Sequence, residues 1–445
     1  MAGKKTQAQL TPEEKLQQAL VPEAEQPYKV PANWCWTYLK NVSDCLDNFR
    51  KPINANERNA RLGYVPYYGA TGQVGWIDDY LTNEELVLLG EDGAPFLDLL
   101  KNKAYLINGK AWVNNHAHIL RSKFGTMGNR LLIEYLNSFD FTGFVTGTTR
   151  LKLTQASMNK IIIPLVPLAE QQRIVERIES LFAKLDEAKE NMQNVLEGFE
   201  TRKAAILHKA FTGELTAKWR KQHGVSMDTW EEKKLGDVTD ILSSKRIYKN
   251  EYVNEGIPFF RSSEIVDLYE YGYTEPKFFI SKDRYDEINK KYGVPEVGDL
   301  LVTSVGTIGK TWIVDERKFY YKDGNITQVK KNSSINMKYL NYFICSENFK
   351  KQVSDTVAGT AYNALTIIKF KNILISIPTL PEQTEIVRII DGLLAKEQQA
   401  NELSENALAK IDLIKKAILA RAFRGELGTN NPADEPAIEL LKRVL

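Results

Sequence analysis

The feature that most constrains the fold of this chain is an internal repeat whose copies are offset by 212 residues. Residues 170–184 read EQQRIVERIESLFAK, and residues 382–396 read EQTEIVRIIDGLLAK. The same offset relates AFTGEL to AFRGEL, and it relates VTGTTRLKLT at 145–154 to VAGTAYNALT at 357–366. Because three matches share one offset without any gap, we expect two copies of one structural unit.

Both copies have the pattern of a long helix. Between 170 and 210 the sequence has no proline and a single glycine, Gly198. Apolar residues recur there at steps of four and three, which is the heptad seam of a coiled-coil helix. In the second copy Glu397 and Ser404 interrupt the equivalent seam, so its middle is expected to be looser, or to face water or a partner. The seam positions of the first copy are Ile174, Ile178, Leu181, Leu185, Ala188, Met192, Val195 and Phe199.

The ends of the helices carry recognisable signals. Thr379 and Glu382 have the spacing of a capping box, and Pro381 suits the first turn of a helix. Gly213 and Gly425 follow the last apolar positions, where a glycine commonly ends a helix in the left-handed conformation. We therefore predict a capped start for the second helix and a glycine stop for both.

Two different blocks precede the helices, and both begin near a tryptophan, Trp34 or Trp230. Short runs in which apolar and polar residues alternate, such as GDLLVTSVGTIGKTWIVDE, are typical of mixed strands and helices. The second helix can best bury its seam against the first, which makes the pair antiparallel. We predict an α+β fold in which two α/β domains are separated by two long antiparallel coiled-coil helices, with a pseudo-twofold repeat. The predicted segments are 1–30 (N-terminal extension), 31–165 (first α/β domain), 166–225 (first spacer helix), 226–378 (second α/β domain), 379–428 (second spacer helix) and 429–445 (C-terminal tail).

Composition excludes several classes of protein but does not by itself identify a partner. The 59 basic and 57 acidic residues leave a net charge of only +2, so charge alone does not point to nucleic acid. No apolar run approaches the roughly 20 residues that cross a bilayer, and the N-terminus lacks the apolar core of a secretory signal. Cys35, Cys45 and Cys345 form no CxxC pair, which disfavours a disulfide framework or a zinc ribbon. We expect a cytoplasmic protein that does not bind membranes.

The repeated motifs resemble those of a known family. The stretches PLAEQQRIVERIESLFAKLD, RKAAILHKAFTGELTAKWR, LPEQTEIVRIIDGLLAK and KKAILARAFRGEL, with YYGATGQVGWIDDYL and DGNITQ inside the blocks, are similar to the specificity subunits of Type I restriction-modification enzymes. The resemblance runs from about Trp34 to Leu427. It implies that the two blocks are target-recognition domains, each of which reads one half of a bipartite site on double-stranded DNA.

The same resemblance implies the partners. The helices are expected to fix the spacing between the half-sites and to bind two methyltransferase subunits, to which restriction and translocase subunits are added. S-adenosylmethionine, ATP and Mg²⁺ are expected on those partners, so that this chain has no cofactor and no catalytic activity. We find no N/D-P-P-Y/F methyltransferase motif in the sequence, in agreement with that expectation.

Polar residues beside glycines mark the candidate DNA contacts of the first block. Asparagine can bind adenine through two hydrogen bonds, and glycine lets a backbone approach phosphate or base edges. Ordinary turns are the alternative interpretation. His116 and His118 alternate along an expected strand, but no third ligand accompanies them at a recognisable spacing, so we favour a structural or DNA-contact role over a metal site. The candidates are Tyr68, Gly69, Thr71, Asn115, His116, Thr148, Thr149 and Arg150.

The second block offers two basic loops and one glycine-rich turn. SVGTIGKT, beginning at Ser304, is similar to a phosphate-binding loop, but it lacks the first glycine of that motif, so we predict a strand, a turn and a strand. Arginine can bind guanine through two hydrogen bonds, and a solvated loop is the alternative. A scaffold whose blocks bind proteins is the other function considered, and an ATPase using this turn is the third. The candidates are Ser244, Lys245, Arg246, Arg261, Ser262, Ser263, Thr303, Ser304, Thr307, Thr360, Tyr362 and Asn363.

Overall fold

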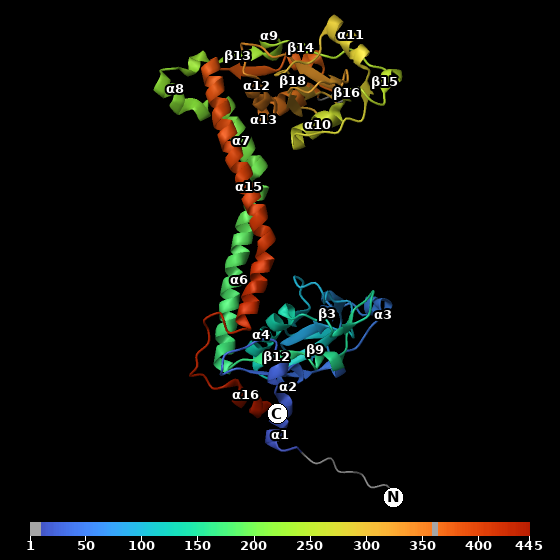
Figure 1. Ribbon diagram of the computed structural model, residues 1–445, viewed down its shortest axis with the longest axis vertical. Coiled ribbons are helices and arrows are strands. Elements are labelled where there is room, and N and C mark those ends of the chain that lie inside the picture. The colour runs from blue at the N-terminus through green and yellow to red at the C-terminus, as the bar shows by residue number, and fades with distance from the viewer. Residues whose placement is uncertain (1–9, 358–363) are drawn as a thin grey trace. The chain divides into compact units, whose positions relative to one another are not determined.

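The computed structural model describes residues 10–357 and 364–445, which divide into two compact units. Unit 1 comprises Met1–Met192 and Glu405–Leu445, and unit 2 comprises Gln193–Ser404. The division falls inside two long helices, α6 (Leu168–Glu197) and α15 (Leu380–Ala422), so each unit holds one globular block and part of each helix (Figure 1). Thr360, Tyr362 and Asn363 lie outside the described residues.

The globular block of unit 1 contains short strands and helices, and the C-terminal helix of the chain belongs to it. Its strands are β1 (Cys35–Tyr38), β2 (Ser43–Cys45), β3 (Val65–Gly69), β4 (Gly72–Ile77), β5 (Thr82–Asn83), β6 (Leu86–Gly90), β7 (Ala104–Ile107), β8 (Lys110–Val113), β9 (Ala117–Ser122), β10 (Val145–Thr146), β11 (Lys152–Leu153) and β12 (Ile162–Leu165). Its remaining helices are α1 (Pro12–Ala19), α2 (Leu39–Val42), α3 (Ala55–Ala60), α4 (Gly125–Ser138), α5 (Gln155–Met158) and α16 (Ala437–Val444).

Unit 2 has the same kinds of element. Its strands are β13 (Glu231–Lys234), β14 (Ile241–Leu242), β15 (Tyr252–Val253), β16 (Ile257–Phe260), β17 (Phe279–Ile280), β18 (Leu300–Thr303), β19 (Thr311–Ile313), β20 (Tyr320–Tyr321), β21 (Ile326–Val329) and β22 (Leu374–Ile377). Its helices are α7 (Phe199–Phe211), α8 (Ala217–His223), α9 (Leu235–Val238), α10 (Ser262–Tyr271), α11 (Lys282–Tyr292), α12 (Met337–Ile344), α13 (Glu347–Val357) and α14 (Ile367–Lys371).

The strand topology is repeated between the units. The order β2-β9-β6-β7 in unit 1 corresponds to β14-β21-β18-β19 in unit 2. A second four-stranded sheet in each unit contains a parallel pair, β3 with β8 and β16 with β20. An antiparallel ribbon joins the start of each block to its end, β1 with β12 and β13 with β22. The predicted α+β fold is therefore confirmed, and the repeat includes blocks whose sequences differ.

Equivalent hydrogen bonds support the match at the level of the backbone. The amide of Leu153 donates to the carbonyl oxygen of Glu91 at 2.7 Å, and the amide of Leu365 donates to that of Ser304 at 2.8 Å. Leu153 and Leu365 are separated by the same offset of 212 as the sequence repeat. Glu91 and Ser304 therefore occupy equivalent places, immediately beyond β6 and β18.

The central strand β6 explains why an apolar run forms the middle of the sheet. All of its residues are buried. Val87 and Leu89 pack in the cluster that contains α4, whereas Leu86 and Leu88 pack in the cluster that contains β8. Since side chains of a strand alternate between faces, burial on both faces requires apolar residues at every position.

The helices pack antiparallel within each unit, as predicted. In unit 1, Lys415 of α15 forms an ion pair with Asp186 of α6, and Arg173, nearer the start of α6, donates to the carbonyl oxygen of Thr429 beyond the end of α15. In unit 2, Glu397 of α15 pairs with Arg202 of α7 at 2.7 Å. Figure 1 shows α6 and α15 side by side.

The first helical segment is broken where the sequence predicted one continuous helix. α6 ends at Glu197, Gly198 follows in the right-handed region with φ of -77° and ψ of -7°, and α7 begins at Phe199. The guanidinium of Arg202 donates to the carbonyl oxygen of Val195, and a Cβ at Gly198 would lie only 2.3 Å from that guanidinium. The glycine thus leaves room for an arginine that satisfies a backbone acceptor at the break.

The second segment, whose seam is interrupted in the sequence, forms one continuous helix of 43 residues. Glu397 binds Arg202, and Ser404 is 9% exposed. The helix is therefore continuous through these polar residues, and the looser packing or exposure to water or a partner expected of this section stays a prediction. Gly213 and Gly425 end the helices in the left-handed region, with φ of 81° and 72°, as predicted.

The capping box predicted at Thr379 is absent, because the carboxylate of Glu382 is fully buried and used elsewhere. It accepts hydrogen bonds from Thr216, Arg220 and Trp230. The equivalent Glu170 in unit 1 is also buried, and its carboxylate accepts from Trp34, Thr429 and Asn430. Each glutamate thus joins the start of its helix to the start of its block and to the segment that follows the other helix.

The two tails of the chain contribute to unit 1. Thr11 forms a capping box with Glu14 at the start of α1. Ala19 of α1 and Leu441 of α16 are buried in the same apolar cluster. Among residues 10–357 and 364–445, no helix combines the length and the apolar composition that crossing a bilayer requires.

Candidate nucleic-acid interface

Unit 1 has an open polar cleft of about 570 Å³ that contains two of the residues selected from the sequence, Asn115 and His116. Both follow β8, and Asn115 is exposed while His116 is half-buried. The neighbouring Asn114 is buried, and its side-chain oxygen accepts from the amide of His116. The residues that line the cleft are Pro52, Ile53, Asn54, Glu57, Arg58, Tyr67, Asn114, Asn115 and His116.

Aromatic side chains of the sheet fix the loop that forms the other wall of the cleft. The hydroxyl of Tyr67, on β3, accepts from the amide of Ile53 at 3.2 Å. The indole of Trp112, on β8, donates to the carbonyl oxygen of Lys51 at 2.8 Å. Because both rings are buried, the loop between β2 and α3 is held against the sheet while its polar side chains remain at the surface.

Asp92 brings together two further residues that the sequence analysis selected. Its carboxylate lies 2.6 Å from the imidazole of His116 and 2.7 Å from the guanidinium of Arg150. Arg150 comes from the loop before β11, and its side chain is 58% exposed. Thr148 and Thr149 are exposed in the same loop. Three segments that are distant in sequence therefore meet at one end of unit 1.

The remaining candidates of unit 1 lie on β3 and its turn. Tyr68 is half-buried and packs against Tyr105, with 5.9 Å between ring centroids. Gly69 is buried, and its carbonyl oxygen accepts from the hydroxyl of Tyr105. Thr71, in the turn between β3 and β4, is exposed. Of these three residues, only Thr71 presents its side chain fully to solvent.

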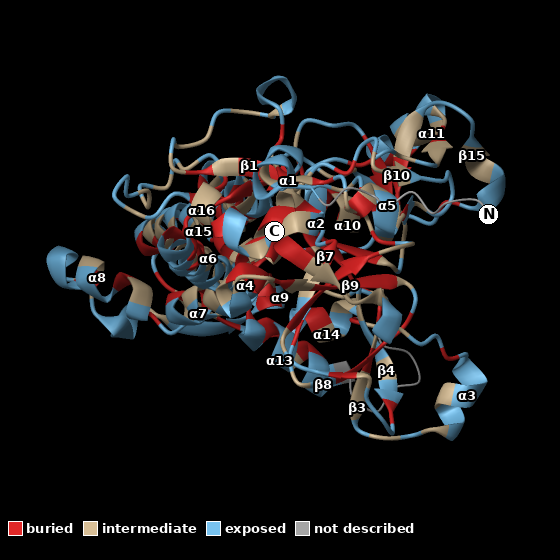
Figure 2. Ribbon diagram, turned by 90° about the horizontal axis from the view of Figure 1, so that it is seen from below, coloured by how far each residue is buried: buried red, intermediate tan, exposed pale blue. Residues whose placement is uncertain are grey.

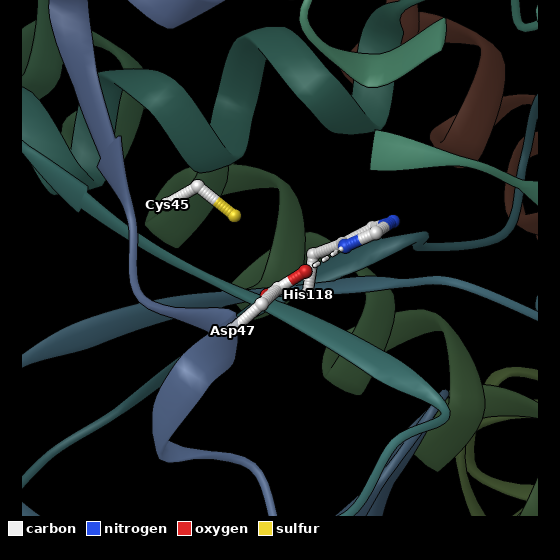
Figure 3. A group of neighbouring side chains, drawn as sticks. All are labelled: Cys45, Asp47 and His118. Carbon is white, nitrogen blue, oxygen red and sulfur yellow. Dashed lines mark hydrogen bonds and ion pairs between the residues drawn. The ribbon is translucent and has the colours of Figure 1, made fainter. Parts of the chain in front are cut away.

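His118 is buried and belongs to a cluster with Cys45 and Asp47, which are both partly buried (Figure 3). Its two ring nitrogens lie 2.6 Å from the Asp47 carboxylate and 2.9 Å from the carbonyl oxygen of Leu153. The ring therefore connects the carboxylate of Asp47 to the backbone of β11.

This cluster does not fit a metal ion. A metal would displace one of the hydrogen bonds of His118, and the third group of the cluster is a thiol. Burial, followed by the charge of Asp47, raises the pKa of Cys45 to about 11. His118 instead joins Asp47, at the end of β2, to Leu153 on β11.

Unit 2 has a cleft of about 360 Å³ beside the segment 364–368, which is the counterpart of 152–156 in unit 1. Ser243, Ser304 and Gly324 line it, together with residues 364–368. The loop after β14 is again fixed by an aromatic residue of the second sheet, because the Tyr320 hydroxyl accepts from the amide of Lys245 at 2.6 Å. Tyr320 pairs with β16 as Trp112 pairs with β3, so the two loops are anchored at equivalent strands.

The basic loop after β14 is exposed at Lys245 and Arg246, while Ser244 is half-buried. The guanidinium of Arg246 lies 2.7 Å from the carboxylate of Asp323. The ammonium of Lys245 lies 5.1 Å from the ring centroid of Tyr292, which is 52% exposed. Cations and aromatic rings therefore share this surface, a combination that suits nucleic acid.

Arg261 is directed toward its own helix rather than toward the basic loop. Its guanidinium contacts the buried carboxylate of Glu264 at 3.0 Å and lies 4.5 Å from the ring centroid of Phe278. Burial opposes ionisation of Glu264, but hydrogen bonds from Arg261 and Ser263 hold the pKa of this carboxyl below its usual value. Ser262, half-buried, contacts the carbonyl oxygen of Asn325. These contacts fix the start of α10.

The SVGTIGKT segment forms the predicted strand, turn and strand, from β18 to β19. Thr303 and Ser304 are 0% and 3% exposed. The Thr303 hydroxyl donates to the carbonyl oxygen of Thr307, and the Ser304 hydroxyl lies 2.5 Å from that of Thr327. Their hydroxyls therefore stabilise the turn, and of the three candidates here only Thr307 has an exposed side chain.

Equivalent positions just beyond β6 and β18 carry different side chains in the two units. Asp92 pairs with Lys152 in an isolated bridge, and Val305 pairs with Ala364, 212 residues beyond Lys152, in the same way. The acidic partner of His116 and Arg150 is therefore replaced by an apolar residue in unit 2.

The sequence analysis missed a group of exposed aromatic and basic residues in unit 1. Tyr64 and Trp76 are 96% and 52% exposed, and the ammonium of Lys110 lies 4.6 Å from the ring centroid of Tyr80. Helix α3, which carries Arg58, is drawn mainly as exposed in Figure 2, in contrast to the buried β9. Aromatic residues of a core strand and of a binding surface look alike in a sequence, so only the interleaved arginines of 58–61 could have signalled this face.

Comparisons with known proteins agree with this arrangement. The family described as Type I restriction modification DNA specificity domain matches residues 32–197 and 227–407. A type I restriction enzyme specificity subunit from Haemophilus influenzae is 30% identical over 373 residues, covering 83% of this chain and 89% of the relative. The EcoKI specificity subunit of Escherichia coli K12 is 29% identical over 296 residues, covering 63% and 61% of the two chains. The crystal structure of the HsdS subunit from Thermoanaerobacter tengcongensis superposes with a TM-score of 0.63 at 20% identity, covering 91% of this chain and all of that one.

Proposed function

The chain belongs to the Type I restriction modification DNA specificity family and is a non-catalytic specificity subunit with two target-recognition domains, and from this premise we propose that it reads a bipartite, asymmetric DNA site. Unit 1 reads one half-site and unit 2 reads the other. The segments 31–165 and 226–378 are the two recognition domains, and 166–225 and 379–428 are the spacers between them.

One observation carries this proposal. The two units share a strand order and an equivalent backbone hydrogen bond, yet equivalent positions just beyond β6 and β18 carry different side chains, Asp92 in unit 1 and Val305 in unit 2. A repeated framework holds two recognition surfaces in the same structural position of each unit. Different side chains that face the base edges then select different DNA sequences. The half-sites should therefore differ from one another.

The partners follow from the same premise. We propose that two methyltransferase subunits bind along the spacer helices and that restriction and translocase subunits join this assembly. S-adenosylmethionine, ATP and Mg²⁺ would then be bound by those subunits. We place the assembly in the cytoplasm, in line with the three cysteines of this chain, which are all free thiols.

The test uses this chain assembled with its methyltransferase subunits. Methylated sites are sequenced in cells that carry the complex, and in cells where residues 31–165 are exchanged for the corresponding domain of a relative. We expect a bipartite site in which the exchange alters one half alone. Binding to a duplex of that site should weaken steeply as salt rises, because phosphate contacts release counterions. Equal binding of random duplexes would instead favour a protein-binding scaffold.

A further inference from the structure

Arg58 differs from the other arginines around the cleft of unit 1. Arg50 forms ion pairs with Asp47 and Glu91, Arg61 pairs with Asp78, and Arg150 pairs with Asp92. Within the part of the chain that the structure describes, the guanidinium of Arg58 has neither an ion pair nor a hydrogen bond. Arg58 lines the cleft, so its donors face a space that a ligand can enter.

Apolar contacts hold Arg58 in place. Its guanidinium lies 4.9 Å from the ring centroid of Tyr67, whose hydroxyl is hydrogen-bonded to Ile53 at the base of the cleft. The Arg58 side chain also contacts Gly75 of β4, where a Cβ would lie 3.2 Å from the Arg58 Nε. A stacked guanidinium loses less freedom when its N–H groups bind a ligand, because its plane is already fixed.

The lining of the cleft favours a base edge over a phosphate. No lysine lines it, and Glu57 does, so an entering phosphate would meet a carboxylate as well as the arginine. The other polar groups are the amides of Asn54, Asn114 and Asn115 and the imidazole of His116. Amide, carboxylate and guanidinium groups together match the donors and acceptors that base pairs present in the major groove.

We propose that Arg58 is a specificity-determining residue that donates two hydrogen bonds to O6 and N7 of a guanine in the half-site read by unit 1. This inference rests on the proposed function, and it specifies one residue of this chain together with the base that this residue contacts. Arg58 was not among the residues selected from the sequence, because nothing in the sequence distinguishes it from the paired Arg61.

The experiment compares the complex of wild-type chain and methyltransferase subunits with complexes carrying Arg58→Ala or Arg58→Lys. Methylated sites are sequenced for each. We expect Arg58→Ala to lose preference for guanine at one position of the unit 1 half-site by about 10-fold or more, given the discrimination typical of a bidentate contact. Arg58→Lys should relax the same position, because an ammonium cannot make the paired contact, while weakening overall methylation less.

The unit 2 half-site is an internal control for folding and assembly, and it should remain unchanged in every variant. Arg61→Ala is the matched control, since Arg61 lies three residues away and is paired with Asp78. It should leave the sequence preference intact. Uniform weakening at every sequence by Arg58→Ala would make Arg58 a phosphate contact, and an unchanged site would make it structural. Either result overturns the inference, whereas absence of a bipartite site in the wild type would overturn the proposed function itself.

Discussion

At the scale of single residues, the chain uses buried polar groups mainly to join segments. His118 is 1% exposed, and its ring binds both Asp47 and Leu153. Burial opposes ionisation of Asp47, but hydrogen bonding and the charge of His118 hold the pKa of Asp47 below its usual value of 3.8. The Asp47 carboxylate also accepts from the amide of Ile119. The charged form of Asp47 therefore stabilises unit 1.

We predict that Asp47→Ala lowers the free energy of unfolding by about 3 kcal/mol, because it leaves the buried ring of His118 and the amide of Ile119 without their hydrogen-bond partner. Thermal or urea unfolding of the purified chain measures this change. The control is Asp78→Ala, which removes an exposed ion pair with Arg61 and should cost less than about 1 kcal/mol. Equal losses in the two variants would contradict a stabilising role for the buried pair.

The same pair gives a pH dependence whose sign is fixed by the depressed pKa of Asp47. Its stabilisation is fully present above the usual pKa of the carboxyl and is lost as the pH falls through the lower pKa of the folded state. The difference in unfolding free energy between wild type and Asp47→Ala should shrink as the pH falls below about pH 4. A difference that grows on acidification would show that the carboxylate is not the stabilising species.

Single-residue roles were only partly predictable from the sequence. Asn115, His116 and Arg150 were selected by residue type, and the structure brings all three to one end of unit 1. Asp92 was not selected, because its partners lie 24 and 58 residues away in the chain. Thr303 was selected as a polar residue beside a glycine-rich turn, but a hydroxyl that closes a turn and one that contacts a ligand have the same sequence signature.

At the scale of elements, heptad periodicity predicted the existence and direction of the helices but not their continuity. The regular copy breaks at Gly198, and the irregular copy is continuous through Glu397. Both outcomes involve Arg202, which binds the carbonyl oxygen of Val195 at the break and the carboxylate of Glu397 on the facing helix. A contact between helices cannot be inferred from the periodicity of either one.

The start of each helix depends on a buried glutamate, and we predict that Glu382→Ala lowers the unfolding free energy of unit 2 by about 3 kcal/mol or more. The change leaves the guanidinium of Arg220, which is 9% exposed, without its carboxylate. Denaturant unfolding followed by circular dichroism measures the loss. Glu402→Ala, on the exposed face of the same helix, is the control and should change stability by less than about 0.5 kcal/mol.

Glu170 allows the charge effect to be separated from the hydrogen bonds. Its partners Trp34, Thr429 and Asn430 are all neutral, so no cation is left behind when it is replaced. Glu170→Gln should therefore be milder than Glu382→Gln. The opposite order would mean that Arg220 finds another partner.

At the scale of the whole molecule, the sequence repeat predicted two domains of one kind, and the structure extends the repeat into blocks that share little sequence. Strand order is maintained by burial: β6 and β18 need only be apolar, and many sequences meet that condition. The clefts are free to vary because their loops are anchored through backbone atoms, as at Lys51 and Lys245. A framework that is stabilised by main-chain contacts can thus support recognition surfaces for unrelated half-sites.

The proposed spacer role gives the last prediction, which concerns the gap between the half-sites. One heptad is inserted into α6 between Glu190 and Asn191, one turn after Asp186. Another is inserted into α15 between Lys410 and Ile411, one turn before Lys415, the partner of Asp186. Seven residues preserve the seam and add roughly 10 Å, about three base pairs of duplex. Sequencing of methylated sites should show a longer gap between unchanged half-sites. An insertion in α6 alone puts the seams out of register and should abolish methylation, whereas a paired insertion that alters the half-sites at an unchanged gap would contradict the spacer role.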